Sequence, residues 1–146
     1  WVQLVEPMRH LFPGLETPES MEGYARDIAG AISRQEALCA VENGTICGVL
    51  AFSRAENELA FLAVSAQHRR QGIARKLAER MFRELDPSRP VKLITYRAGV
   101  PEGEAARSLY QRLGFCPGRL VEVDGSPAQE FLRPAEIPGS ERSEAE

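Results

Sequence analysis

Three segments of the chain repeat apolar residues with the period of an amphipathic helix. In the first segment, Thr17 is a favourable N-cap and Pro18 fits the first helical position. The apolar positions that follow are Met21, Tyr24, Ala25, Ile28, Ala29 and Ile32. The second segment, 72–85, carries Ile73, Leu77, Met81 and Leu85 in one row and Ala74, Ala78 and Phe82 in the next. The third, 102–113, ends at Gly114, as helices often do. We therefore expect three helices.

The apolar runs outside these helices are short and rich in residues that favour strands. Residues 37–54 and 119–132 each hold two such runs around a central Asn-Gly or Asp-Gly pair, which is a strong signal for a two-residue hairpin turn. Three further runs are expected to be single strands: Val2–Val5, Glu58–Val64 and Val91–Tyr96.

This order of elements predicts a mixed α/β fold with a mostly antiparallel sheet. The helix over 72–85 connects two strands, so these two should run parallel, whereas the hairpins make antiparallel pairs. A chain of 146 residues suits one core, and we expect residues 1–133 to form a single domain. Residues 134–146 hold four glutamates and one arginine and are expected to be a disordered acidic tail.

Composition and charge exclude several classes of protein. The chain is 43% apolar with a net charge of −3, and no run approaches the roughly 20 apolar residues of a membrane span. The tail accounts for all of the net charge, which leaves a neutral body without the broad basic surface of a nucleic-acid-binding protein. We expect no membrane and no nucleic acid among the partners.

The three cysteines are expected to be reduced. In a hairpin centred on residues 43–44, Cys47 faces Ala40 and Cys39 faces Gly48, so the two thiols point to opposite faces of the sheet. Reduced thiols favour a cytoplasmic protein. Metal binding is disfavoured at this point, because neither His10 nor His68 has a ligand-spaced partner in the sequence.

The turn between the strand at 58–64 and the helix at 72–85 is unusually basic. In and just after it lie Arg69, Arg70, Arg75, Lys76, Arg80 and Arg83. Gly72 permits close backbone approach, and the first turn of the helix offers unpaired N–H groups at the positive end of its dipole. The pattern predicts an anion site suited to a pyrophosphate. A solvated basic surface is the simpler interpretation of such a turn taken alone.

Two motifs resemble the GNAT superfamily of N-acetyltransferases. Arg69-x-x-Gly72-x-Ala74 matches the [QR]-x-x-G-x-[GA] loop that binds the pyrophosphate of acetyl-CoA, and "AARSLYQRLGF" at 105–115 resembles the second signature, A-x-x-L-Y-x-x-x-G-F. The resemblance covers about 38–132 and implies helices on both faces of a sheet whose parallel central strands splay apart. It also implies transfer of an acetyl group from acetyl-CoA to a primary amine, by direct attack in a ternary complex and without a metal.

The resemblance also implies a set of cofactor-binding residues. The loop from Arg69 to Arg75 would hold the pyrophosphate, and the backbone of the preceding strand would pair with the pantetheine arm, with the Leu62 amide as a donor to the thioester oxygen. The full set is Leu62, Ala63, Val64, Arg69, Arg70, Gln71, Gly72, Ile73, Ala74 and Arg75. Gly103 departs from the family, because many members have an asparagine there, and it puts the contacts of that position in doubt.

Two residues are candidates for the chemistry. Tyr110, at the motif tyrosine, is the candidate general acid that returns a proton to the CoA thiolate; the alternative is a half-buried helix tyrosine. Glu58 resembles the glutamate that serves as base in the histone-acetylating branch; the alternative is an exposed carboxylate that opens a strand. Glu56 and His68 are weaker candidates for the base.

Two other functions are kept as alternatives. One is a protein of the same fold that binds acyl-CoA without turnover. The other is a helix-turn-helix DNA-binding protein, since "RRQGIARKLAERM" places basic residues on a helix, although strands are expected on both sides of it. The acceptor stays open between a small amine, a peptide N-terminus and a lysine side chain, and a homodimer is compatible with the sequence.

Overall fold

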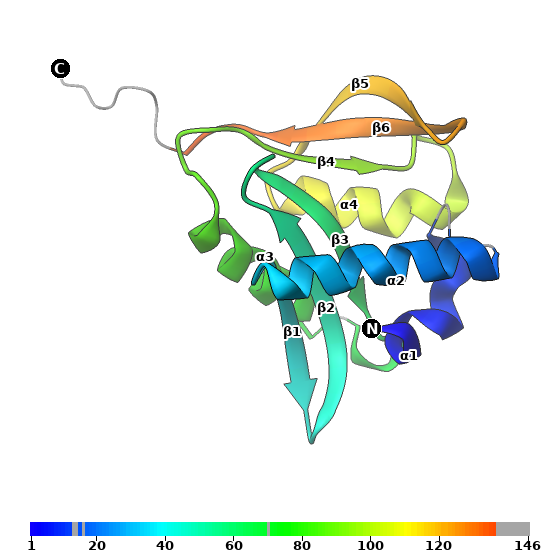
Figure 1. Cartoon of the computed structure of the whole chain (residues 1–146). Coiled ribbons are helices and arrows are strands. Elements are labelled where there is room, and N and C mark those ends of the chain that lie inside the picture. The colour runs from blue at the N-terminus through cyan, green and yellow to red at the C-terminus, as the bar shows by residue number, and fades with distance from the viewer. Residues whose placement is uncertain (13–14, 16, 70, 137–146) are drawn as a thin grey trace, which may run out of the picture. The chain divides into compact units, whose positions relative to one another are not determined.

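The structure is a computed structural model that describes residues 1–12, 15, 17–69 and 71–136. Its helices are α1 (Val2–Val5), η1 (Glu6–Leu11), α2 (Pro18–Ser33), η2 (Ala66–His68), α3 (Ile73–Glu84), η3 (Pro101–Gly103) and α4 (Glu104–Arg112), where η marks a 3-10 helix (Figure 1). Its strands are β1 (Ala37–Glu42), β2 (Thr45–Ser53), β3 (Glu58–Val64), β4 (Val91–Thr95), β5 (Cys116–Val123) and β6 (Ser126–Arg133).

The six strands follow the order β1-β2-β3-β4-β6-β5 in one sheet. β3 and β4 pair in parallel, at Glu58 and Lys92, while β1–β2, β4–β6 and β5–β6 pair antiparallel. This confirms the predicted mixed α/β class, with one parallel pair in a mostly antiparallel sheet. The part of the predicted tail from 137 to 146 lies outside the described residues.

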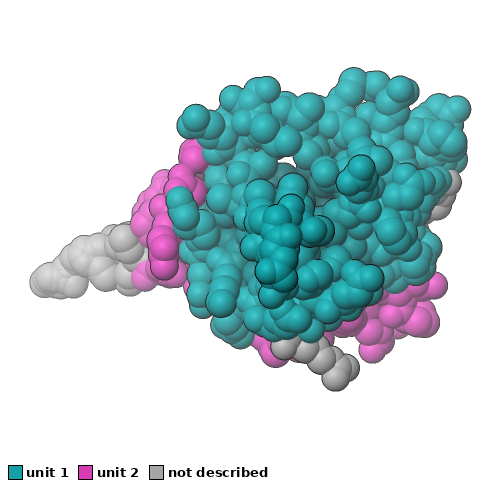
Figure 2. Space-filling model, turned by 90° about the horizontal axis from the view of Figure 1, so that it is seen from below, with its two compact units in different colours: residues 1–53, 59–81 teal, residues 54–58, 82–146 magenta. Residues whose placement is uncertain are grey.

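The chain folds into two compact units, each of which is built from two separate stretches of the sequence (Figure 2). The first unit comprises residues 1–53 and 59–81, and the second comprises 54–58 and 82–146. Each unit is described by itself below.

The N-terminal segment is helical, so the prediction of a strand at Val2–Val5 was wrong. The Val5 amide donates to the Trp1 carbonyl over 2.9 Å, which closes one helical turn. Val5 and Met8 are buried in the core of the first unit. Six residues of the segment pack in or against that core: Trp1, Leu4, Val5, Met8, Leu11 and Phe12. This spacing of three and four residues is helical, and it was hidden by the β-branched residues at the start.

Both predicted hairpins are present, with the predicted two-residue turns. All four turn residues have positive φ, at 52° and 78° in the first turn and 50° and 79° in the second: Asn43, Gly44, Asp124 and Gly125. This is the backbone of a type I′ turn, whose twist suits the flanking strands.

The register of the first hairpin differs from the prediction beyond the turn. Val41 pairs with Ile46 as expected, but Ala40 pairs with Gly48, so a β-bulge leaves Cys47 without a partner across the ladder. Cys39 consequently lies opposite Val49 rather than Gly48. All three cysteines are free, as predicted, and of these Cys47 is buried. A bulge redirects the side chain of its extra residue.

In the first unit, helices cover both faces of β2. A Cβ on Gly48 would lie 3.0 Å from Ile73 and 3.1 Å from Leu77, so α3 packs directly over this glycine. Ala51 belongs to the other face because side chains alternate along a strand. It packs in one cluster with Met21 and Ile28 of α2. Two covered faces explain why β2 reads as a continuous apolar run rather than an alternating one.

In the second unit, Asn57 joins the start of β3 to the segment before β4. Its side chain is fully buried: Nδ2 contacts the carbonyls of Asp86, Arg89 and Pro90 at 3.1–3.3 Å, and Oδ1 accepts from the Asp86 amide at 2.9 Å. Buried polar groups are kept in such satisfied networks because an unpaired one is costly. This network fixes the backbone next to Glu58.

Candidate functional site

The basic turn has the backbone geometry of an anion site. Gly72 has a φ of +76°, and a Cβ there would meet nothing within 4 Å, so the conformation and not the space calls for glycine. Its carbonyl accepts the first helical bond of α3, from the Lys76 amide at 3.0 Å. The amides of Ile73, Ala74 and Arg75 in the first turn therefore have no intrahelical acceptor. Such amides, at the positive end of the helix dipole, favour an anion.

The side chains of this turn are not all directed to solvent. Gln71, Gly72 and Arg75 are exposed, whereas Ile73 and Ala74 are half-buried. Arg69 is exposed too, but its Nε donates to the Val64 carbonyl at 3.3 Å and its Nη2 lies 3.6 Å from the sulfur of Met8. The Arg69 guanidinium is thus engaged by the first unit's own groups. Arg70 lies outside the described residues.

The three predicted pantetheine-contacting residues lie together at the end of β3. Leu62 and Ala63 are buried and Val64 is half-buried. β3 pairs with β4 at Glu58, which is the first residue of β3. The candidate backbone donors, Leu62 to Val64, lie several residues beyond this pairing, toward the end of β3.

Glu58 lies half-buried in the second unit, next to the Asn57 network. Burial raises the pKa of its carboxyl from the usual 4.5, the neighbouring Lys92 lowers this pKa in part, and the carboxylates of Glu56 and Glu130 raise it. Lys92 is itself ion-paired with Glu56, with 3.2 Å between Nζ and Oε1. A carboxyl whose pKa is raised toward neutrality is better matched to proton transfer than an ordinary exposed one.

Tyr110 is the buried residue of α4 and is 9% exposed. Its ring packs edge-on against Phe115 and Phe131, with centroid separations of 6.1 and 6.4 Å. These contacts fix the plane of the phenol and also account for the apolar environment that the helix periodicity predicted. The Tyr110 hydroxyl is therefore carried on a ring whose orientation is fixed by packing.

The structure gives a reason for the glycine at position 103 that the sequence alone did not reveal. It is the buried N-cap of α4, and a Cβ there would lie within 3.0 Å of three side-chain atoms of Tyr96. Any side chain at 103, asparagine included, would overlap the tyrosine. The ring of Tyr96 thus takes the space beside the position where many family members carry an asparagine.

We expect Gly103→Asn to lower the free energy of unfolding by about 3 kcal/mol, because overpacking of a filled site is destabilising. The double variant Gly103→Asn/Tyr96→Ala should recover part of this loss, as residues in contact are coupled. Urea denaturation measures both variants. Gly23→Asn is the control, since a Cβ at Gly23 comes no closer than 3.9 Å to a neighbour. Additive losses in the double variant would contradict the account.

Arg107 is a further residue of this region that sequence reasoning missed. Its Nη1 donates to the Tyr96 carbonyl at 2.8 Å and to Oε1 of Gln129 at 2.7 Å, and its guanidinium lies 4.9 Å from the ring centroid of Phe131. Arg107 therefore holds the chain after β4 against β6 and positions Tyr96. The one available signal was its place inside the second motif, on a helix whose other face is apolar.

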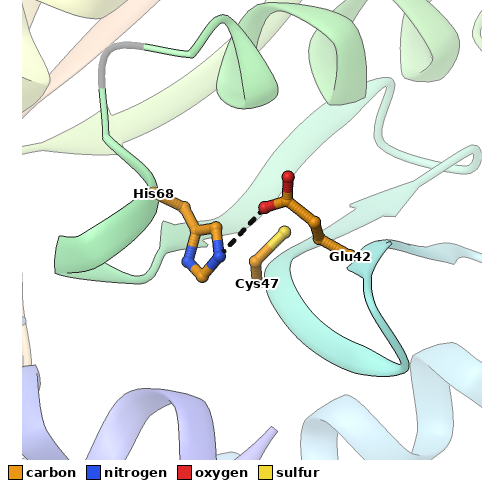
Figure 3. A group of neighbouring side chains, drawn as sticks. All are labelled: Glu42, Cys47 and His68. Atoms are coloured by element: carbon orange, nitrogen blue, oxygen red, sulfur yellow. Dashed lines mark ion pairs between the residues drawn. The ribbon is translucent and has the colours of Figure 1, made fainter.

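The structure also brings together three residues that the sequence had separated. Glu42, Cys47 and His68 place their candidate ligand atoms within 4.8 Å of one another (Figure 3). Spacing along the chain gave no sign of this group, because the three residues approach one another only in the fold.

Comparison with known families identifies the class of this protein. The family model described as "Acetyltransferase (GNAT) domain" matches residues 33–117, more than half of the chain. The chain belongs to the GNAT acetyltransferase family. A comparison with curated proteins gave no match.

Solved structures agree on the fold. An acetyltransferase of the GNAT family from Desulfovibrio desulfuricans is similar at a TM-score of 0.66 and 18% identity, over 90% of this chain and 87% of that one. The ribosomal-protein-S18-alanine N-acetyltransferase of Escherichia coli gives 0.56 and 22%, over 75% and 76%. The NatC complex bound to Gag peptide and CoA gives 0.61 and 20%, over 75% and 78%. Within the described residues, no helix is long and apolar enough to cross a membrane.

Proposed function

We propose that the chain transfers an acetyl group from acetyl-CoA to a primary amine by direct attack in a ternary complex. The observation that carries this proposal is the strand–turn–helix from β3 to α3 in a GNAT chain, with Gly72 at positive φ and the first-turn amides without helical acceptors. The similar NatC structure, which was solved with CoA, supports a CoA ligand.

The turn and the strand before it provide the cofactor contacts. The amides from Gln71 to Arg75 receive the pyrophosphate, and the exposed Arg75 side chain adds charge. The backbone from Leu62 to Val64 pairs with the pantetheine amides as an added strand would. The Leu62 amide donates to the thioester oxygen and stabilises the negative charge that forms there during attack.

Glu58 and Tyr110 handle the two protons of the reaction. Glu58 accepts a proton from the ammonium form of the acceptor, directly or through water, and the neutral nitrogen attacks the thioester carbon. The C–N bond forms, the C–S bond breaks, and CoA leaves as a thiolate that takes its proton from the Tyr110 hydroxyl. The nitrogen loses its second proton, which passes through water to the Tyr110 phenolate, and Glu58 releases the first proton to solvent. No covalent acyl-enzyme is needed, since neither motif contains a cysteine nucleophile.

The raised pKa of Glu58 gives this assignment a pH signature. The folded state holds the Glu58 proton more tightly than the unfolded state, so the stabilisation is complete below the usual pKa of 4.5 and is lost as pH rises through the raised value. Glu58→Gln should therefore become more stable relative to the parent protein as pH rises, and should lower kcat about 100-fold.

Thermal melts on either side of pH 4.5 and steady-state kinetics check the two parts of this prediction. Glu122→Gln is the control, because Glu122 is exposed on β5 and has no assigned part in the reaction or in the pKa of Glu58. Equal kcat in Glu58→Gln and the parent would contradict the role of Glu58 as base.

The test of the proposed function is thiol release from acetyl-CoA with a panel of acceptors. The panel contains small primary amines, peptides with free N-termini and peptides with one free lysine, with mass spectrometry of the products. One similar structure is named as a ribosomal-protein-S18-alanine N-acetyltransferase and another is a complex bound to a peptide and CoA, which makes a peptide amine the first acceptor to try. Amine-dependent release with one acetyl group added to the acceptor is expected; release only by hydrolysis would contradict the proposal.

A second function, binding of acyl-CoA without turnover, is supported by one observation. Tyr96 fills the space at Gly103, where many family members carry an asparagine. Binding of acetyl-CoA with no turnover across the acceptor panel would favour this alternative. The three free cysteines fit a reducing compartment, and we propose the cytoplasm as the site of either function.

A further inference from the structure

One cluster of side chains in the first unit has no part in the proposed acetyl transfer. Glu42 is the last residue of β1, Cys47 is the extra residue of the β2 bulge, and His68 is the last residue of η2. Nε2 of His68 lies 3.0 Å from Oε1 of Glu42, and the Cys47 sulfur completes a group within 4.8 Å (Figure 3). Figure 3 shows the three side chains converging from the two strands of the hairpin and from the turn.

We propose that Glu42, Cys47 and His68 bind a Zn²⁺ ion. Thiolate, imidazole and carboxylate form a mixed donor set that suits Zn²⁺ and not Mg²⁺ or Ca²⁺, which prefer oxygen ligands alone. With Zn–N and Zn–O bonds of about 2.1 Å and a Zn–S bond of about 2.3 Å, tetrahedral ligand atoms lie roughly 3.5 Å apart. In the cluster, the distance between nitrogen and oxygen is 3.0 Å and no pair of candidate ligand atoms is more than 4.8 Å apart, so small side-chain movements suffice to reach this geometry. A water molecule would take the fourth position.

The three candidate ligands differ in solvent exposure, as expected for a metal site that an ion can enter from solvent. Cys47 is 2% exposed, the His68 side chain 24% and the Glu42 side chain 50%. The thiol is therefore fixed within the fold, while the carboxylate at the rim can adjust to the ion. Cys47 is the residue that the bulge leaves without a partner across the ladder, so no side chain of β1 lies directly opposite it.

Ser65 supplies the support that metal-binding histidines usually have. Its hydroxyl lies 2.5 Å from Nδ1 of His68, and its amide donates to the Cys47 carbonyl at 2.9 Å. Zinc-bound histidines commonly donate the other ring N–H to such a partner. A serine hydroxyl can donate or accept, so it can serve His68 in the metal-free chain, where Nε2–H faces Glu42, and in the metal-bound one.

Metal binding requires loss of one proton from the cluster. The Cys47 thiol donates to the Ala40 carbonyl over 3.5 Å. On binding, His68 changes tautomer, so that its proton moves from Nε2 to Nδ1 and the Nε2 lone pair is free for the metal. The S–H bond of Cys47 breaks, the thiolate electron pair forms the Zn–S bond, and this proton passes to solvent, because thiolates are the metal-binding form of cysteine.

The site would tie the tip of the β1–β2 hairpin to the turn that leads to α3. His68 is followed directly by Arg69, and Gly72 lies four residues further on. An ion at this point would therefore order the start of the segment to which we assign the pyrophosphate. The metal proposal does not depend on that assignment, since it concerns ligands outside the loop motif.

The experiment is titration of the metal-free full chain with Zn²⁺ and with Co²⁺. We expect 1:1 binding of Zn²⁺ by calorimetry, and with Co²⁺ a thiolate-to-metal charge-transfer band together with the visible bands of a tetrahedral site. The chain has two histidines and three cysteines, so histidine and cysteine residues outside the cluster provide matched controls. Cys47→Ser and His68→Gln should lose the charge-transfer band or the binding, whereas Cys39→Ser and His10→Gln should keep both.

A positioning role for Ser65 gives a second, graded test. Ser65→Ala should weaken Zn²⁺ binding about 10- to 100-fold while the charge-transfer band persists at saturation, as expected for a partner that orients a ligand. Absence of Zn²⁺ binding at millimolar metal would overturn the proposal. So would a charge-transfer band that survives in a folded Cys47→Ser variant, or equal binding in folded His68→Gln and the parent.

Discussion

Gly72→Glu is expected to remove detectable binding of acetyl-CoA. Two effects act at this position. A non-glycine residue at a φ of +76° is strained by about 1–2 kcal/mol, and a carboxylate is placed beside the amides assigned to the pyrophosphate. Because no neighbour lies within 4 Å of a Cβ at Gly72, the fold should tolerate the substitution apart from that strain. Calorimetric titration with acetyl-CoA measures the loss.

The chain provides a matched control at Gly125. This glycine has a φ of +79° and an equally open surrounding, but it lies in the β5–β6 turn. Gly125→Glu adds the same charge and the same strain away from the basic turn, so it should bind acetyl-CoA as the parent does. Gly72→Ala separates strain from charge. Undiminished affinity in a folded Gly72→Glu variant would mean that the phosphate site lies elsewhere.

Tyr110→Phe is expected to lower kcat by about 10²–10⁴-fold while the affinity for acetyl-CoA stays within a factor of a few. Loss of a general acid typically has an effect of this size. The phenyl ring keeps the edge-on packing against Phe115 and Phe131, so the fold should be retained. Steady-state kinetics, binding and thermal melts are measured on the same preparation.

The melts distinguish chemistry from packing at Tyr110. Phe82→Leu is a suitable comparison, because Phe82 also packs against Phe115, at 6.1 Å, and has no proposed part in proton transfer. It should lower the melting temperature with little change in kcat. An unchanged kcat in Tyr110→Phe would remove the acid role and leave Tyr110 as a core residue of α4.

Local patterns sufficed for most of the fold. The Thr17 N-cap is present, with its side chain accepting from the Ser20 amide at 3.1 Å, and both two-residue turns have the positive φ values that their Gly-containing pairs predict. The N-terminal segment differs from the prediction because residues 2–5 are too few to show a helical period. The helical spacing of the apolar residues is apparent only over the longer stretch that ends at Phe12.

The parts of the site that could not be predicted depend on contacts between distant residues. Asn57 reads as a turn residue until its carbonyl partners at 86–90 are known. In the sequence, Gly103 suggests only that the asparagine of many family members is missing; the structure adds that Tyr96 occupies the space beside it. Cys47 meets His68 only in the fold, because the whole of β3 separates the two residues in the sequence. By contrast, the basic turn to which we assign the pyrophosphate consists of consecutive residues, so its glycine and the start of α3 could be predicted from the sequence.

Calorimetric titration of the full chain with acetyl-CoA and, separately, with CoA tests the proposed cofactor site. We expect 1:1 binding of both ligands in the micromolar range, weakened by raised salt, because we assign the pyrophosphate to a basic turn. Absence of binding of either ligand at millimolar concentration would contradict the account and would leave the basic turn as a solvated surface.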